Sequence, residues 1–239
     1  MKEAYPILAW TIENAVKRFA KTEKARTYLR PVFESILLGA ELMERMAVPH
    51  ATSFLQFQDR KLTVSNNKSL VLQSGDREKA VQFLKDWFEY EVQEYLKIQD
   101  PYFSLNDLEF LNLLVSVNPN CEVYVLTGLS NQEKTSKSLK ETYHDYWRLN
   151  ISEQRPPDTE VVIVGNQHGR PPFHDRWLIT KSGGLRLGTS LNSLGRKVSE
   201  ISRMSPEEVS ERESILDQYL IHHKKNSDDG RLQYETFTL

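Results

Sequence analysis

The sequence predicts an α/β layered domain at residues 93–239, preceded at residues 1–92 by a helical region with a small antiparallel sheet. From Ile98 onward, strand-like and helix-like segments alternate, which is typical of layered α/β domains. Before that point, apolar residues recur mainly at helical spacing. The 239 residues suffice for one large domain with a substantial extension.

The N-terminal region divides into three segments. Residues 7–46 carry apolar side chains at helical spacing, and Pro31 interrupts the pattern, so we expect two helices. Residues 53–72 are typical of short strands joined by polar turns. An apolar stripe after Asp76 predicts a further helix that ends near residue 95. Because residues 1–92 carry no catalytic motif, this region is expected to dimerise the chain, bind a protein partner or cover an active site.

The second region predicts a regular succession of elements. Strands are expected at 97–103, 121–128, 159–165, 173–180, 184–188 and 198–202, and helices at 106–115, 132–149 and 206–223. A loop rich in Gly and Pro at 165–172 leads into the strand at 173–180. Residues 226–239 are expected to be only partly ordered.

Charge and cysteine content limit the classes of function. With 31 Lys and Arg against 33 Asp and Glu, the chain has no overall basic character, so any polyanion site must be local. The single cysteine, Cys121, has no partner for an intramolecular disulfide or a thiolate metal site, which fits a reducing cytosol. No segment approaches the roughly 18 apolar residues of a membrane span. These observations predict a soluble cytoplasmic protein with no membrane partner.

The residues that indicate chemistry lie between 173 and 202. His174 and Arg176 are two apart on an apolar strand, so their side chains are expected to share one face. A Gly and Ser loop follows at 188–192, and together these features indicate a phosphate site. Taken alone, such a pair is more often an ion-paired, half-exposed strand face. Asp100, which follows a strand, could support the loop or Arg176, or could equally be a turn residue.

Four segments carry a family resemblance: IQDPYFSLNDLEFL, VYVLTG, FHDRWLIT and LGTSLNSLGRKVSEIS. Together they resemble bacterial phospholipase-D-like domains of the single-motif kind, including those with HDR in place of HxK. The resemblance covers roughly residues 95–222. It implies a mixed sheet between helices and, in active relatives, phosphodiester hydrolysis through a covalent phosphohistidine without a metal or other cofactor.

The resemblance also implies roles for individual residues. His174 would be the nucleophile, Arg176 would replace the family's lysine, and Thr189, Ser190 and Asn192 would donate hydrogen bonds to the phosphate. Glu200 would accept a hydrogen bond from the imidazole of His174 and so determine its tautomer.

Two features depart from the family pattern. Lys181 stands where the family has an aspartate, and the loop holds one more residue before its asparagine. The chain also carries one motif, whereas the chemistry needs two histidines, so the resemblance implies either a homodimer or no catalysis.

Two functions follow. The first is a metal-independent phosphodiesterase or nuclease that acts on DNA or RNA as a dimer, in a bacterial defence or mobile-element setting. The alternative is a non-catalytic module that binds a phosphate group of nucleic acid, lipid or a protein partner. A shared basic surface would favour a polynucleotide, and its candidate residues are Arg170, Arg176, Arg186, Arg196 and Lys197. Motifs for nucleotide hydrolysis, dinucleotide binding, zinc proteolysis and ester hydrolysis are absent from the sequence.

Overall fold

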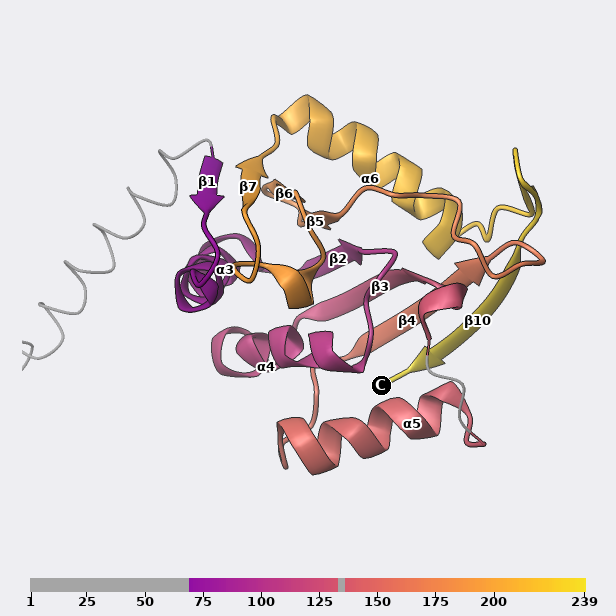
Figure 1. The fold of residues 1–239 in the computed structure, drawn as a ribbon, viewed down its shortest axis with the longest axis horizontal. Coiled ribbons are helices and arrows are strands. Elements are labelled where there is room, and N and C mark those ends of the chain that lie inside the picture. The colour runs from indigo at the N-terminus through magenta and orange to yellow at the C-terminus, as the bar shows by residue number, and fades with distance from the viewer. Residues whose placement is uncertain (1–68, 133–135) are drawn as a thin grey trace, which may run out of the picture. The chain divides into compact units, whose positions relative to one another are not determined.

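A computed structural model describes residues 69–132 and 136–239. These residues form a mixed eight-stranded sheet with helices on both faces, and a separate two-stranded hairpin (Figure 1). The α/β class with a large mixed sheet is therefore confirmed. The helices predicted within residues 7–46 and the strand segments between 53 and 68 lie outside the described residues.

The elements have the following bounds. The helices are α3 (Arg77–Glu91), α4 (Leu108–Val117), α5 (Leu139–Tyr146) and α6 (Pro206–Leu220). The strands of the large sheet are β1 (Ser69–Leu72), β2 (Tyr95–Gln99), β3 (Glu122–Gly128), β4 (Thr159–Gly165), β5 (Trp177–Ile179), β6 (Gly184–Leu187), β7 (Ser199–Arg203) and β10 (Gln233–Thr238). The hairpin consists of β8 (Asn226–Ser227) and β9 (Gly230–Arg231), and short helical turns are η1 (Leu105–Asp107), η2 (Leu129–Asn131), η3 (Trp147–Ile151) and η4 (Leu191–Ser193). Within the described ranges, no helix is long and apolar enough to cross a membrane.

The strand order of the large sheet is β1-β7-β6-β5-β2-β3-β4-β10. Strands β2, β3 and β4 are parallel, and every other neighbouring pair is antiparallel. Strands β3 and β4 are nearly continuous apolar runs because both of their faces are covered. From these pairings, β6 runs in the same direction as β2, β3 and β4. The loops that follow these four strands therefore emerge at one edge of the sheet.

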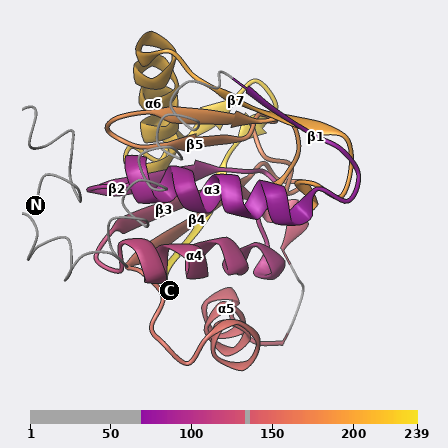
Figure 2. The same cartoon turned by 90° about the vertical axis from the view of Figure 1, so that its left-hand side faces the viewer.

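Two apolar cores lie on opposite faces of the sheet. On one face, Trp87 of α3, Leu111 of α4 and Tyr143 of α5 belong to the larger core. On the other, Leu216 and Tyr219 of α6 pack with Trp177 of β5. Figure 2 shows α6 on the opposite side of the sheet from α4 and α5. The start of α6 is well specified locally, because Ser205 and Glu208 form a capping box and Pro206 occupies the first turn.

The N-terminal part of the described chain belongs to this domain. Trp87 and Phe88 of α3 pack in the same core as Ile98 of β2, and β1 pairs with β7 as an edge strand of the large sheet. The chain divides into compact units at residues 60/61, whereas we expected the boundary at 92/93. The apolar stripe of α3 predicts a buried helix face, but it does not specify the sheet against which that face packs. Likewise, β1 belongs to the large sheet and not to a separate small one.

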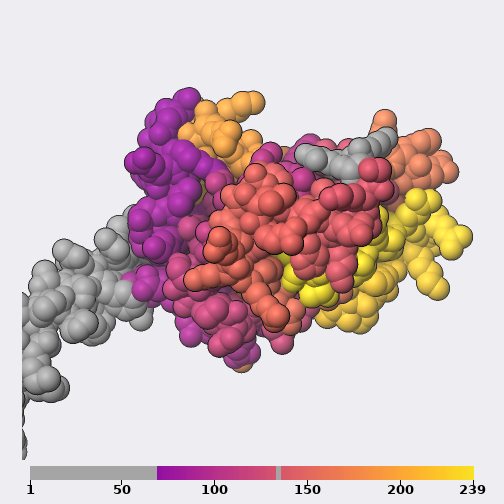
Figure 3. All heavy atoms as spheres, turned by 90° about the horizontal axis from the view of Figure 1, so that it is seen from below, coloured from indigo at the N-terminus to yellow at the C-terminus, as the bar shows by residue number. Residues whose placement is uncertain are grey.

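The C-terminal residues form an edge strand, although we expected them to be only partly ordered. Strand β10 pairs along its whole length with β4. The centres of the aromatic rings of Phe237 in β10 and Tyr143 in α5 lie 5.2 Å apart. Figure 3 shows the C-terminal segment in yellow beside α5. Most side chains of β10 are exposed and polar, so the strand has a weak local signal and depends on its pairing with β4.

Candidate functional site

The predicted site residues other than Glu200 gather at the edge of the sheet where β2, β3, β4 and β6 end. Asp100 directly follows β2, the loop 188–198 follows β6, and the chain from β4 reaches β5 through residues 166–176. Residues that are far apart in the sequence thus meet because parallel strands end at the same edge.

His174 and Arg176 lie just before β5, because this strand is shorter than the predicted strand at 173–180. Trp177 packs in the core beneath α6, so Arg176 points to the opposite face. There its Nε atom lies 3.9 Å from Oδ1 of Asp100, and its guanidinium lies 5.1 Å from the ring centre of Tyr102. The side chain of His174 is exposed and forms no hydrogen bond or ion pair with the described residues. The structure therefore positions the guanidinium of Arg176, whereas the imidazole of His174, two residues earlier, is exposed.

Asp100 joins the end of β2 to the loop after β6. Its side chain is fully buried, and its two oxygens accept hydrogen bonds from the backbone amides of Tyr102 at 2.9 Å and Leu191 at 3.0 Å. Burial raises the pKa of Asp100, whereas the two amides and the charge of Arg176 act in the opposite direction. Asp100 therefore contacts both the loop, through Leu191, and Arg176, the two partners that the sequence suggested for it.

The loop residues Thr189, Ser190 and Asn192 are half-buried or buried at the same edge. Ser190 donates a hydrogen bond to Oδ1 of Asn192 at 3.3 Å, and Nδ2 of Asn192 donates to Asp107 at 3.2 Å. Asp107 is itself fully buried, and burial together with the nearby charge of Asp100 raises its pKa to about 6. The amide of Asn192 is thus fixed by a carboxylate that the sequence analysis did not identify.

Arg77, at the start of α3, also holds this loop, and the sequence analysis missed it. Its Nη1 atom donates hydrogen bonds to the backbone oxygens of Leu191 at 2.8 Å and Leu194 at 3.1 Å, and its Nη2 atom pairs with Glu109. Gly195 allows the close approach: its φ is +70°, and a Cβ atom there would meet the amide nitrogen of Arg77 at 2.5 Å. More than a hundred residues separate Arg77 from the loop, so no local pattern could reveal the contact.

Glu200 does not reach His174, which corrects the role expected for it. In β7, Ile201 packs in the larger core on the face toward which Arg176 points, so the neighbouring Glu200 points to the other face. Its side chain is exposed and makes no hydrogen bond or ion pair with the described residues. A strand can return beside the site and still present the carboxylate on the wrong face, because successive side chains alternate.

The basic residues proposed as one surface are divided between two locations. Arg170, Arg196 and Lys197 are exposed in loops at the site edge, where Arg176 also lies. Arg186 instead pairs with Glu208 of α6 at 3.0 Å on the opposite face of the sheet. No cluster of three or more His, Cys, Asp or Glu side chains that could hold a metal occurs in the described part of the chain.

Comparisons with known proteins give structural matches without sequence matches. No protein-family model matches the chain, and no curated protein matches it. NucT from Helicobacter pylori is similar over 65% of this chain and 96% of its own, at 12% identity and a TM-score of 0.44. The polyphosphate kinase from Porphyromonas gingivalis is similar over 70% of this chain and 24% of its own, at 12% identity and a TM-score of 0.41. TrmBL2, an archaeal chromatin protein, is similar over 82% of this chain and 66% of its own, at 13% identity and a TM-score of 0.39.

Proposed function

We propose that this chain is a metal-independent phosphodiesterase that cleaves nucleic acid as a homodimer, with His174 as the nucleophile. The observation that carries the proposal is that Arg176 is positioned by its neighbours but keeps its hydrogen-bond donors unpaired. Asp100 and Tyr102 lie against its guanidinium, yet none of its nitrogens, including the buried Nε, donates a hydrogen bond to the described residues. A positioned guanidinium with free donors suits the equatorial oxygens of a phosphate under attack.

In this mechanism, a neutral imidazole nitrogen of His174 attacks phosphorus, and the bond to the leaving oxygen breaks. His174 of a second copy protonates that oxygen, and water then hydrolyses the phosphohistidine. Arg176, together with Thr189, Ser190 and Asn192, would stabilise the charge on the phosphate oxygens. Asp100 would be a positioning residue, since it contacts both Arg176 and the loop. We further propose that such an enzyme acts in bacterial defence or in a mobile element, a setting supported by the family resemblance of the sequence alone.

A nucleic-acid substrate is supported by the exposed cations Arg170, Arg196 and Lys197 in the loops beside Arg176. A polyanion that extends beyond one phosphate would gain from each of them.

One observation favours the alternative, a phosphate-binding module without catalysis. His174 has no hydrogen-bond partner among the described residues, and Glu200 lies on the opposite face of the sheet. Without a group that determines its tautomer, an imidazole is a weaker general base and nucleophile. Such a module would bind through Arg176 and the loop alone.

The test is incubation of the full chain with labelled single-stranded and duplex DNA and RNA in EDTA, with cleavage and retention both measured. The variants are His174→Ala and Arg176→Met, with His144→Ala as the control because His144 is an exposed histidine of α5 beside Thr238, which pairs with the start of β4 and so lies away from the site edge. We expect cleavage by wild type and the control, retention without cleavage by His174→Ala, and weakened binding by Arg176→Met. Retention by wild type without any cleavage would support the binding module instead. Failure of wild type to bind or cleave would overturn both functions for nucleic acid.

A further inference from the structure

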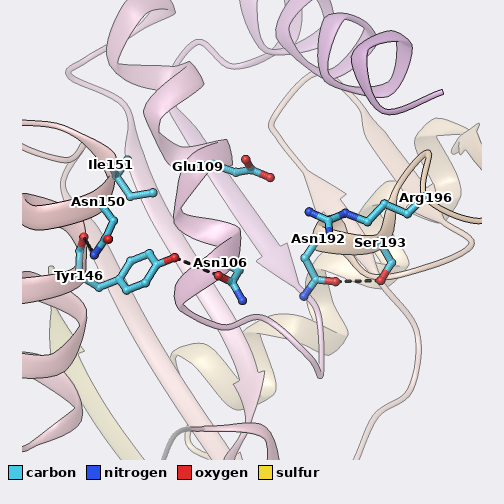
Figure 4. Close-up of a pocket in the computed structure, with 8 residues that line it drawn as sticks. All are labelled: Asn106, Glu109, Tyr146, Asn150, Ile151, Asn192, Ser193 and Arg196. Atoms are coloured by element: carbon cyan, nitrogen blue, oxygen red, sulfur yellow. Dashed lines mark hydrogen bonds between the residues drawn. The ribbon is translucent and has the colours of Figure 1, made fainter. Parts of the chain in front are cut away.

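An open pocket adjoins the loop that carries Asn192. Its volume is about 430 Å³, within the range of roughly 300–1,000 Å³ that is usual for small-molecule sites. The lining side chains come from η1 and the start of α4, from the end of α5 and η3, and from the loop after β6 (Figure 4). They are Asn106, Glu109, Tyr146, Asn150, Ile151, Asn192, Ser193 and Arg196.

The hydrogen bonds of two carboxamides in this lining, those of Asn106 and Asn150, leave one carboxamide donor and one carboxamide acceptor available. The hydroxyl of Tyr146 donates to Oδ1 of Asn106 at 2.9 Å, so Nδ2 of Asn106 is left as a donor. Nδ2 of Asn150 donates to the backbone oxygen of Tyr146 at 3.2 Å, so Oδ1 of Asn150 is left as an acceptor. Neither remaining atom has a hydrogen-bond partner among the described residues, and both side chains are exposed. Tyr146 therefore orients two carboxamides, one with a free donor and the other with a free acceptor.

The rest of the lining defines the character of the pocket. The side chain of Arg196 is exposed and unpaired among the described residues, and it extends from the loop into the pocket mouth. Ile151 is the one aliphatic side chain in the lining, so the pocket does not suit an acyl chain. Asn192 belongs both to the pocket and to the loop fixed by Asp100, which places the pocket next to the candidate phosphate site.

We propose that this pocket binds the unpaired base of a nucleotide whose phosphate lies near Arg176 or Arg196; the inference rests on the proposed function and specifies its substrate. Carboxamides recognise bases because a base edge presents adjacent donors and acceptors. Asn106 offers a donor at one end of the Tyr146 side chain and Asn150 an acceptor at the other, so each would bind a different atom of the base, and Arg196 provides a cation for a flanking phosphate. A base in a duplex hides its pairing edge, so the pocket selects single-stranded or flipped nucleotides.

The first test compares two single strands of eight nucleotides by fluorescence anisotropy, one with bases and one fully abasic. Wild type is expected to bind the strand with bases at least about tenfold more tightly, since one good amide–base pair contributes about 1–3 kcal/mol. Asn106→Leu and Asn150→Leu should lose this preference while binding the abasic strand as wild type does. Asn226→Leu, at an exposed asparagine of β8, is the matched control and should retain it. Equal wild-type affinity for the two strands, or a preference that both pocket variants retain, would overturn the inference.

A second measurement separates this inference from the proposed function. Nucleoside monophosphates and ribose 5-phosphate are titrated separately into the full chain, and the side-chain amide resonances of Asn106 and Asn150 are followed by NMR. Shifts with a nucleotide but not with ribose 5-phosphate would support the base pocket even if no strand were cleaved. Equal shifts with both ligands, or none with either, would contradict it even if cleavage were observed.

Discussion

Asp100 and Asp107 are buried carboxylates that hold the same loop from two positions. Asp100 accepts a hydrogen bond from the backbone amide of Leu191, and Asp107 accepts one from the side-chain amide of Asn192. Both have a raised pKa, mainly because burial disfavours their charged forms. The loop therefore depends on groups whose charge costs free energy at neutral pH.

Asp107 gives a prediction for the pH dependence of stability. Its pKa is raised to about 6 in the folded state, above the usual value of about 4 in an unfolded chain. Its contribution to stability is therefore fully present below about pH 4 and is lost as the pH rises through 6. Relative to Asp107→Asn, the unfolding free energy of wild type should increase as the pH falls from 7 to 4, measured by denaturant unfolding.

The exposed Asp228, in the turn between β8 and β9, provides the control for this experiment. The difference between wild type and Asp228→Asn should stay nearly constant over the same pH range. A constant difference for Asp107→Asn as well would show that Asp107 titrates normally in the folded protein.

At the scale of single residues, the sequence indicated candidate site residues where they belong to a short motif. His174, Arg176 and the loop at 188–192 could be selected from their spacing and resemblance, and Asp100 from its place after a strand. Arg77 and Asp107 could not be selected, because their importance comes from contacts with residues more than 80 positions away. Glu200 was assigned from its place in the chain, whereas the strand face decides its direction.

The contact between α3 and the loop after β6 is the main element-level feature of the site. Arg77 donates to two backbone oxygens of this loop, and Gly75 donates a backbone hydrogen bond to Gly195 at 2.9 Å. A helix that we assigned to an N-terminal extension therefore supports the candidate phosphate-binding loop.

Arg77→Met should loosen the loop while the sheet stays intact. The variant replaces the guanidinium over Phe110 by an apolar side chain and loses the pairing with Glu109 and the hydrogen bonds to the loop, so we expect destabilisation by about 1–3 kcal/mol. Amide hydrogen exchange should become faster for the loop 191–196 than in wild type and remain unchanged in β3. Lys85→Met, at an exposed position of the same helix, is the control and should change neither region. Unchanged amide hydrogen exchange of the loop in Arg77→Met would show that the loop does not depend on the hydrogen bonds from Arg77.

At the scale of the whole molecule, the chain carries a single histidine motif, while the proposed chemistry uses two. A homodimer with its site on a two-fold axis would provide the second histidine. Subunit mixing tests this directly, because a dimer with one His174→Ala subunit would lack either the nucleophile or the general acid.

Activity should therefore follow the fraction of wild-type dimers. After complete subunit exchange at equal concentrations, about one quarter of the dimers are wild type, so cleavage per total protein should fall to about one quarter. His144→Ala mixed with wild type in the same way is the control and should leave the rate unchanged. A rate of one half would mean that each subunit acts alone, and a monomer by analytical ultracentrifugation would exclude the shared site.

The sequence by itself determined the α/β class, most strand and helix positions after residue 95, and the choice of His174, Arg176 and the loop 188–192. These features depend on local periodicity and on motifs within a short stretch of chain. Tertiary structure decided that α3 and β1 belong to the sheet domain, that the C-terminal residues form β10, that Glu200 faces away from Arg176, and that three asparagines line one pocket. Each of these depends on strand order, register or helix docking, which bring together residues that no local pattern relates.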